Sequence, residues 1–357
     1  YYPDGQIRDE VYVYGSFAQS RMAAEGVRCS HCHNPHSGRL VAEGNALCQT
    51  CHDASYNSPR HTHHNAESAA SQCVECHMRP RTYMGIDARR DHGFHIPRPD
   101  WTVRSEVPNA CNACHSEQSA GWAQTAIEQW YGPVRPKDVH GTEARLSALA
   151  NEPDATEQLL NAAADPSAAP IVRASAIQLL GEQSGAAVGD GLVNALADPS
   201  PLVRTTAIGS LEGAPPNALQ NLLPPLLRDP SRSVRSEAAR VLSGLPGITP
   251  ENRPDYEKAL LEYRAGQEAL SDQPGAQLNL AVLAAREGRS GEAEAVYREA
   301  LRLDSLFLPA RFNLAMLYEA QGRTREAETE LRAAVKTAPE LADAHYSLGL
   351  LLAADPA

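Results

Sequence analysis

The stretch CSHCHNPHSG, residues 29–38, holds two cysteines three residues apart, a histidine directly after the second cysteine, and another histidine three residues further on. The C-x-x-C-H pattern returns three more times, so the eight cysteines of the chain form four pairs and a histidine follows each pair. The pairs are Cys29/Cys32, Cys48/Cys51, Cys73/Cys76 and Cys111/Cys114, and the histidines are His33, His52, His77 and His115.

This pattern is the attachment signature of c-type haem. The two thiols add to the two vinyl groups of one porphyrin, and the adjacent histidine reaches the iron as an axial ligand. Four copies that use every cysteine predict four covalently bound haems. The eight cysteines are then the thioether positions, and His33, His52, His77 and His115 are the proximal iron ligands.

Three other chemistries use paired cysteines. The first two pairs enclose fifteen residues, which fits a zinc ribbon, but a ribbon does not require a histidine after every second cysteine. A thioredoxin-like dithiol would need a βαβ pattern, and none is visible. Structural disulfides would not produce four identical local motifs. Zinc remains the alternative to haem.

Seven further histidines lie in the same region: His31, His36, His61, His63, His64, His92 and His95. As distal iron ligands we favour His36, His61, His64 and His92. His36 is too close to its own motif to face its own haem easily, and we expect it on a neighbouring iron. Met84 and Met22 are weaker candidates, of the competing methionine ligand type. His95 is a further weaker candidate. The fourth haem, at His115, is the hardest to supply with a distal ligand.

Residues 1–139 show little helix or strand periodicity and are rich in Gly, Pro, Asn and Ser. Such a segment buries little apolar area by itself, so we expect the porphyrins to provide its core and folding to depend on their attachment. The sequence therefore predicts a loop-rich tetrahaem cytochrome c domain over residues 1–139. Its arginines, Arg79, Arg81, Arg89, Arg90 and Arg98, either bind haem propionates or form a solvated charged loop.

After the linker YGPVRPKDVHG the sequence becomes rich in Ala and Leu and repeats itself. A DPS turn followed by V-R occurs three times, with Arg173, Arg204 and Arg235 spaced by 31 residues, which resembles HEAT-like repeats over 140–248. A period of 34 follows, in which Asn279-Leu280-Ala281 returns as Asn313-Leu314-Ala315, as in tetratricopeptide repeats over 249–357. The second half is predicted to be an all-α solenoid with a concave surface for a partner protein or for copies of the chain itself.

The formal net charge of −12 argues against a nucleic-acid partner, because such proteins usually present a basic face. No run approaches the roughly 18 apolar residues that a membrane span needs. The first ten residues, YYPDGQIRDE, lack the basic and apolar regions of a signal peptide, so an exported form of this chain is expected to have lost its signal already.

Four segments together resemble a family of exported multihaem c-type cytochromes with a doubled-CxxCH haem region that runs on into tetratricopeptide repeats. They are DEVYVYGSFAQSRMAAEGVRCSHCHNPHSG, GNALCQTCH, QCVECHMRPRTYMGIDARRDHGFHIPRPD and PNACNACH. The resemblance implies bacterial origin, a periplasmic or extracellular location, and electron transfer through closely stacked haems. It supports the four proximal histidines and points to His36, His61, His64 and His92. Where the family often has arginine, this sequence has His95.

The leading hypothesis is an electron-transfer protein rather than an enzyme, in which four mostly bis-histidine haems pass electrons by hopping and the helical repeats dock redox partners. The alternative is a multihaem reductase of a small nitrogen or sulfur compound at one five-coordinate haem. Spare histidines outnumber the irons, which favours the electron carrier.

Overall fold

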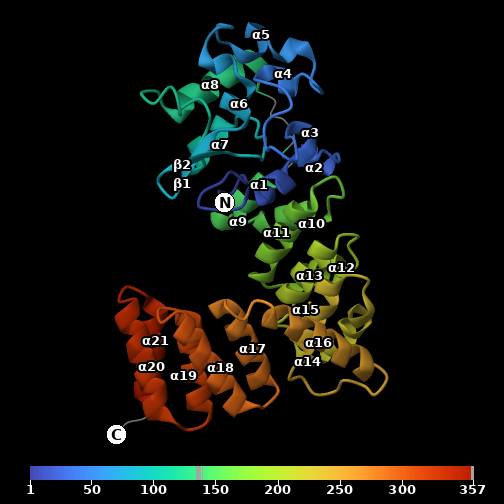
Figure 1. Ribbon diagram of the computed structural model, residues 1–357, viewed down its shortest axis with the longest axis vertical. Helices are drawn as coiled ribbons and strands as arrows, with labels where there is room; N and C mark the ends of the chain where they lie inside the picture. The colour runs from blue at the N-terminus through green and yellow to red at the C-terminus, as the bar shows by residue number, and fades with distance from the viewer. Residues whose placement is uncertain (134–137, 139, 355–357) are drawn as a thin grey trace. The chain divides into compact units, whose positions relative to one another are not determined.

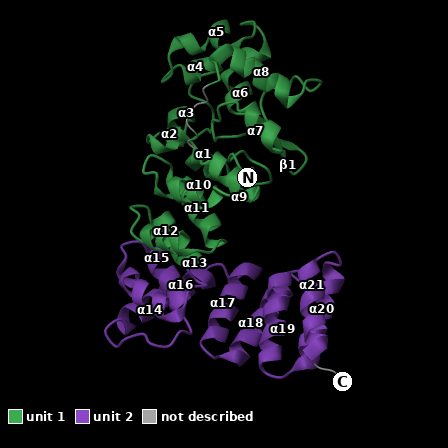
Figure 2. Ribbon diagram, turned by 180° about the vertical axis from the view of Figure 1, so that it is seen from behind, with its two compact units in different colours: residues 1–210 green, residues 211–357 purple. Residues whose placement is uncertain are grey.

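The computed structural model describes residues 1–133, 138 and 140–354. The chain divides into two compact units, Tyr1–Ser210 and Leu211–Ala357, which are coloured separately in Figure 2. This division falls inside the segment assigned to HEAT-like repeats from the sequence. The predicted domain boundaries at 139/140 and 248/249 stay predictions, and linker residues 134–137 and 139 lie outside the described residues.

The haem-motif region of the first unit is built from short helices and one hairpin (Figure 1). The hairpin strands pair antiparallel, with Pro80 opposite Arg90 and Tyr83 opposite Asp87. The helices and strands are α1 Val13–Gln19, α2 Arg21–Ala24, α3 Cys29–Cys32, α4 Asn45–Cys48, η1 Ala54–Tyr56, α5 Pro59–Thr62, η2 Ala69–Ser71, α6 Cys73–His77, β1 Pro80–Tyr83, β2 Asp87–Arg90, α7 Pro99–Arg104 and α8 Ala120–Tyr131.

The first two haem motifs lie in a stretch without a protein core. Between Ser20 and Ser71 not one residue is buried, although this span contains α2 to α5 and both cysteine pairs. A chain of this length normally needs buried apolar area to offset its conformational entropy. That bound porphyrins provide the core of these segments stays a prediction.

A small protein core lies where the haem-motif region meets the first repeat helix. Trp101, Val107 and Leu146 are buried together, and Tyr2 packs against them. The indole of Trp101 donates to Glu143, which also accepts from Arg104 at 2.5 Å. These contacts join α7 to the first repeat helix, α9, so this end of the haem-motif region packs on an apolar cluster.

The helices that follow the linker, as far as Glu268, are α9 Thr142–Leu149, α10 Ala155–Ala164, α11 Pro170–Gly181, α12 Ala186–Ala195 and α13 Pro201–Ser210 in the first unit, and α14 Pro216–Leu222, η3 Pro224–Arg228, α15 Arg232–Leu242 and α16 Arg253–Glu268 in the second. Their three DPS turns have the same hydrogen bond, in which the serine amide donates to the aspartate side chain at 2.7–2.8 Å. This Asx turn explains the repeated sequence, because Asp accepts from the backbone two residues on and starts the next helix.

The last five helices pack as two helical hairpins and one further helix: α17 Pro274–Arg286, α18 Ser290–Leu303, α19 Leu308–Ala320, α20 Thr324–Thr337 and α21 Ala342–Ala354. Their core contains small and aromatic side chains such as Ala281, Tyr297, Leu314 and Tyr318. Each hairpin turns at a glycine with positive φ, Gly288 at 75° and Gly322 at 73°, which is the conformation that glycine adopts without strain. The period of 34 predicted from the sequence is therefore a repeating helical hairpin.

Candidate haem-binding site

Each C-x-x-C-H motif closes one helical turn. The amide of His33 donates to the carbonyl of Cys29, and the same bond joins the first cysteine and the histidine in the second and fourth motifs, at 2.8–2.9 Å. The third motif is the helix α6 itself. In such a turn residues i, i+3 and i+4 share one face, so two thiols and an imidazole point to the same side of the chain. All eight cysteines are free and none is buried.

The first, second and fourth motifs each combine one exposed and one half-buried cysteine. Cys111 is half-buried, but Cys114 is exposed, as are Cys29 and Cys51. The polar residues 115–119 that follow Cys114 are exposed as well. Cys114 still lies near the third motif, since its charge contributes to raising the pKa of Cys76. Its assignment as a thioether therefore stays a prediction based on the motif.

Three of the four motif histidines face a second histidine across a gap of one consistent size. The ring centroids of His33 and His92 lie 6.3 Å apart, those of His77 and His61 lie 6.3 Å apart, and those of His115 and His64 lie 6.1 Å apart. Metal–imidazole bonds are about 2 Å long, so two rings on opposite sides of one ion have centres roughly 6 Å apart. The spacing of these rings therefore fits a haem iron held between two imidazoles.

Hydrogen bonds orient these imidazoles. His33, His64, His77 and His92 each donate Nδ1–H to a backbone carbonyl, of Gly38, Thr62, His95 and Arg90 respectively, at 2.6–3.0 Å. A carbonyl only accepts, so Nδ1 carries the proton and Nε2 keeps its lone pair for a metal. Burial also lowers the pKa of His77 and of His92, which favours the neutral ring that a metal requires.

The four motifs follow one another in space in chain order. Burial and then the neighbouring Cys51 thiol raise the pKa of Cys32, which places the first motif beside the second. Burial and then Cys73 raise the pKa of Cys48 to about 11, which places the second beside the third. Burial and then Cys111 raise the pKa of Cys76, which places the third beside the fourth. Consecutive attachment points are thus close neighbours.

His52 is the motif histidine that differs. Its ring makes an edge contact with Tyr56 at a centroid distance of 6.4 Å, and among the described residues no second histidine ring faces it as in the other three pairs. His36, the remaining favoured candidate, is exposed in the turn after the first motif, where its amide donates to the Asn34 side chain. The structure brings His61, His64 and His92 opposite motif histidines and leaves His36 on the surface.

The weaker candidates occupy other surroundings. Met84 is 63% exposed at the turn of the hairpin, and Met22 is half-buried in α2. His95 is buried with its Nε2 3.6 Å from Asp91, and its ring lies 5.0 Å from that of His140, closer than in the three facing pairs. His31 is exposed, and its Nδ1 accepts from the Arg28 amide.

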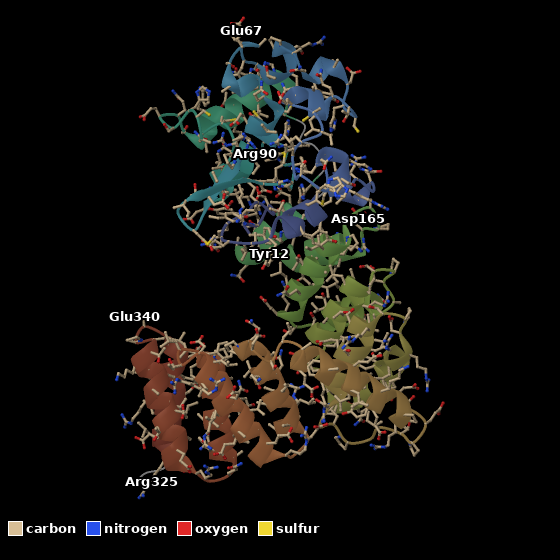
Figure 3. All side chains as sticks on the ribbon, in the orientation of Figure 1. Tyr12, Glu67, Arg90, Asp165, Arg325 and Glu340 are labelled. Carbon is tan, nitrogen blue, oxygen red and sulfur yellow. The ribbon has the colours of Figure 1, made fainter. Side chains whose placement is uncertain are left out.

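Four of the five arginines considered for haem propionates are engaged by protein carboxylates. Arg90, which Figure 3 labels, and Arg79 both pair with Glu75, at 2.7 and 3.2 Å. Arg89 pairs with Asp87 and Arg98 with Asp100, each at 2.7 Å, while Arg81 lies over the Tyr2 ring. These pairs favour a charged network within the protein over dedicated propionate clamps.

The sequence analysis did not predict that aromatic side chains of α8 contact histidines of the haem-motif region. Trp130 stacks on His63 with centroids 4.0 Å apart, and Trp122 contacts the ring of His115 at 5.0 Å. Tyr131 donates its hydroxyl to the carbonyl of His61 at 2.7 Å. The signal available in the sequence was the gathering of aromatic residues in GWAQTAIEQWY, shortly after the fourth motif.

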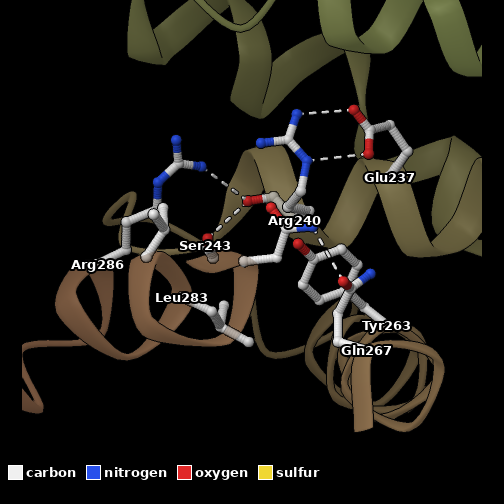
Figure 4. A pocket seen from close by; sticks show the side chains of 9 residues that line it. Glu237, Arg240, Ser243, Tyr263, Gln267, Leu283 and Arg286 are labelled. Carbon is white, nitrogen blue, oxygen red and sulfur yellow. Dashed lines mark hydrogen bonds and ion pairs between the residues drawn. The ribbon is translucent and has the colours of Figure 1, made fainter. Parts of the chain in front are cut away.

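A pocket of about 250 Å³ in the second unit lies among α15, α16 and α17 (Figure 4). Arg240 and Arg286 line it, and both pair with Glu212, Arg240 at 2.8 Å. Arg240 also pairs with Glu237 at 2.7 Å, so two carboxylates balance the two guanidinium charges. In the described part of the chain, no group of three or more Cys, His, Asp or Glu side chains is placed to hold a bare metal ion, and no helix combines the length and the apolar character of a membrane span.

Comparison with known families gives three matches along the chain. Residues 22–57 match the doubled CXXCH motif, residues 189–265 match HEAT repeats, and residues 284–351 match the tetratricopeptide repeat. The first match indicates haem binding of the c-type and suggests a multihaem cytochrome. The other two confirm both kinds of helical repeat, in the predicted order. None of the curated proteins compared with this chain matches it.

Proposed function

We propose that this protein is an electron-transfer cytochrome with four covalently attached c-type haems. The observation that carries the proposal is the set of three facing histidine pairs, His33/His92, His77/His61 and His115/His64. In each pair one member belongs to a C-x-x-C-H motif and the other comes from elsewhere in the chain. An iron with two protein ligands has no free position for a substrate, which favours a carrier over an enzyme.

One cysteine pair and its adjacent histidine would hold each haem. When bound, the haems supply one-electron oxidation and reduction, and transfer by hopping from one haem to the next is the activity we propose. The chain contributes by fixing the order of the attachment points and by orienting the imidazoles through Nδ1 hydrogen bonds. Burial also lowers the pKa of His77 and of His92, which favours their neutral form.

His36 is our proposed sixth ligand for the iron at His52. Three of the four favoured distal histidines lie opposite the other motif histidines, so His36 and His52 remain for each other. The proximity of Cys32 and Cys51 supports this, because it puts the loop that carries His36 beside the second motif. His36 is exposed, and the amides of His36 and Ser37 donate to the Asn34 side chain, so a local turn presents His36 at the surface.

The alternative function, reduction of a small nitrogen or sulfur compound, has its best support at the same iron. A five-coordinate haem at His52 would be open to such a ligand. The ring of His64 lies 6.1 Å from that of His115, which supports His64 as the distal ligand for the haem that the sequence left hardest to supply. The two functions therefore differ in the ligand state of one haem.

Carbon monoxide binding to the reduced full-length holoprotein separates them. The carrier is expected to be low-spin at all four haems and to bind no carbon monoxide, and His36→Ala is expected to open one haem in four. His31→Ala is the matched control, since His31 is also exposed but lies inside its own motif. Wild-type protein that binds carbon monoxide at one haem in four would overturn the carrier and support the reductase.

The helical repeats are proposed to dock redox partner proteins or further copies of the chain, as HEAT and tetratricopeptide repeats often mediate protein interactions. The resemblance of the haem region to exported cytochromes supports a bacterial periplasmic or extracellular location. Cell fractionation followed by haem staining tests this location, and haem-stained protein confined to the cytoplasm would overturn it.

A further inference from the structure

We propose that α8 is a positioning element that sets the sixth ligands of two irons at once. Its last two residues, Trp130 and Tyr131, hold the segment His61–His64, whose first and last members face His77 and His115. This inference rests on the proposed function, because it concerns how distal ligands are held. It assigns His63 a role as the point of attachment rather than as an iron ligand.

The segment needs support because of its backbone. Two residues three apart in a helix share one face, so a continuous helix would direct His61 and His64 the same way. Helix α5 instead ends at Thr62, and His63 takes the left-handed conformation with φ 53°. A residue with a Cβ is strained there. The turn lets His61 and His64 face two different motif histidines, and contacts elsewhere must maintain it.

Trp130 supplies the first of these contacts. Its indole stacks on the His63 ring with centroids 4.0 Å apart and planes within 5° of parallel. The stack covers the ring of the strained residue itself. Both aromatic planes gain contact area in this arrangement.

Tyr131 supplies the second contact. Its hydroxyl donates to the carbonyl of His61 at 2.7 Å, and its ring meets those of His61 and His63 edge-on at 6.5 and 5.6 Å. Trp130 and Tyr131, two consecutive residues of α8, thus contact the segment His61–His64 at two points. The other end of α8 is fixed near the fourth motif, because Ser119 caps the helix and Trp122 contacts the ring of His115.

The test measures haem content, spin state and carbon monoxide binding of the full-length holoprotein. Trp130→Ala is expected to keep four haems per chain while opening two of them to carbon monoxide, because both distal histidines lose their support together. His61→Ala and His64→Ala calibrate the signal and are each expected to open one haem. Trp130→Phe, which keeps an aromatic face, is expected to remain low-spin. Tyr12→Ala removes a tyrosine that is 90% exposed and is the control.

The outcomes separate this inference from the proposed function. If His61→Ala and His64→Ala each open one haem while Trp130→Ala opens none, the ligand assignment stands and the role of α8 is refuted. If neither histidine variant opens a haem, the ligand assignment itself fails. Should Trp130→Ala reduce the haem content, Tyr131→Phe decides. Carbon monoxide binding by this variant, which the wild type is expected to lack, supports the role of α8, and a variant that binds none overturns it.

Discussion

The haem-motif region and the tetratricopeptide helices are organised by different physical means. The first region buries no residue between Ser20 and Ser71, whereas α17 to α20 surround a core of buried Ala, Leu and Tyr side chains. The first is expected to be ordered by covalently attached groups and the second by side-chain packing alone. We therefore expect one chain to combine a segment whose folding depends on a cofactor with a segment whose folding depends on the periodic placement of its apolar side chains.

The largest effect is expected from removing haem attachment. With all eight cysteines changed to alanine, amides of residues 21–70 should lose nearly all protection from hydrogen exchange, because no protein core remains there. Amides of α17 to α20 should keep their protection. Hydrogen exchange of the variant and the holoprotein, measured by mass spectrometry, tests both expectations. Protected amides at residues 21–70 of the variant would contradict the dependence of this region on haem.

A substitution in the core of the tetratricopeptide helices is expected to destabilise those helices and leave the haem-motif region unchanged. Leu314 is fully buried in the tetratricopeptide core, and Leu314→Ala should lower the free energy of unfolding by about 2 to 5 kcal/mol. The haem absorption spectrum should stay as in wild type. Leu306→Ala is the control, since Leu306 is 66% exposed and its truncation leaves no cavity. A variant with altered haem spectra would show that the two regions are not independently organised.

A smaller effect is expected at Glu212. Burial alone would raise its pKa, but hydrogen bonds from Arg240 and Arg286 outweigh burial and lower the pKa to about 2. A lowered carboxylate pKa stabilises the folded state above the ordinary value of 4.5, and this contribution is lost as the pH falls toward 2.

Because the Glu212 side chain is 34% exposed, solvent screens part of the interaction. Glu212→Gln is therefore expected to reduce the free energy of unfolding by only about 1 to 2 kcal/mol at pH 7, with the difference from wild type shrinking below pH 4.5. Chemical denaturation at several pH values measures it. Glu299→Gln, in an exposed pair with Arg302, should change stability little at any pH, and an equal loss there would contradict the argument.

Some of this molecule could be predicted from the sequence because the signals are local. The C-x-x-C-H motifs are single helical turns, and the DPS turns and Gly288 are fixed by their own hydrogen bonds and backbone angles. These features need no knowledge of the rest of the fold. The repeats follow for the same reason, since each unit contacts mainly its neighbours.

The surroundings of each motif depend instead on how distant segments meet. His92 lies far from His33 in sequence, and its pairing was not assigned before the structure placed the two rings opposite each other. The motif also does not reveal that Cys114 is exposed while Cys111 is half-buried, because the sequence pattern of the fourth motif is the same as that of the others.

The aromatic support of the His61–His64 segment was missed because a tryptophan in a helix is usually interpreted as core. Its significance appears only once Trp130 is seen against His63. Which iron His36 serves remains a proposal.

The arginines of the repeated helices carry one more consequence. Arg173 pairs with Asp198 of the following DPS turn at 2.9 Å, and Arg235 pairs with Glu262 of the following helix at 2.8 Å. Each of these two arginines thus forms an ion pair with a carboxylate of the repeat unit or helix that follows it. A gene duplication that inserted one more 31-residue unit would add both an arginine and the aspartate of a DPS turn, which are the two partners of such an ion pair. The number of units in this solenoid can therefore change in evolution without further changes in the neighbouring units.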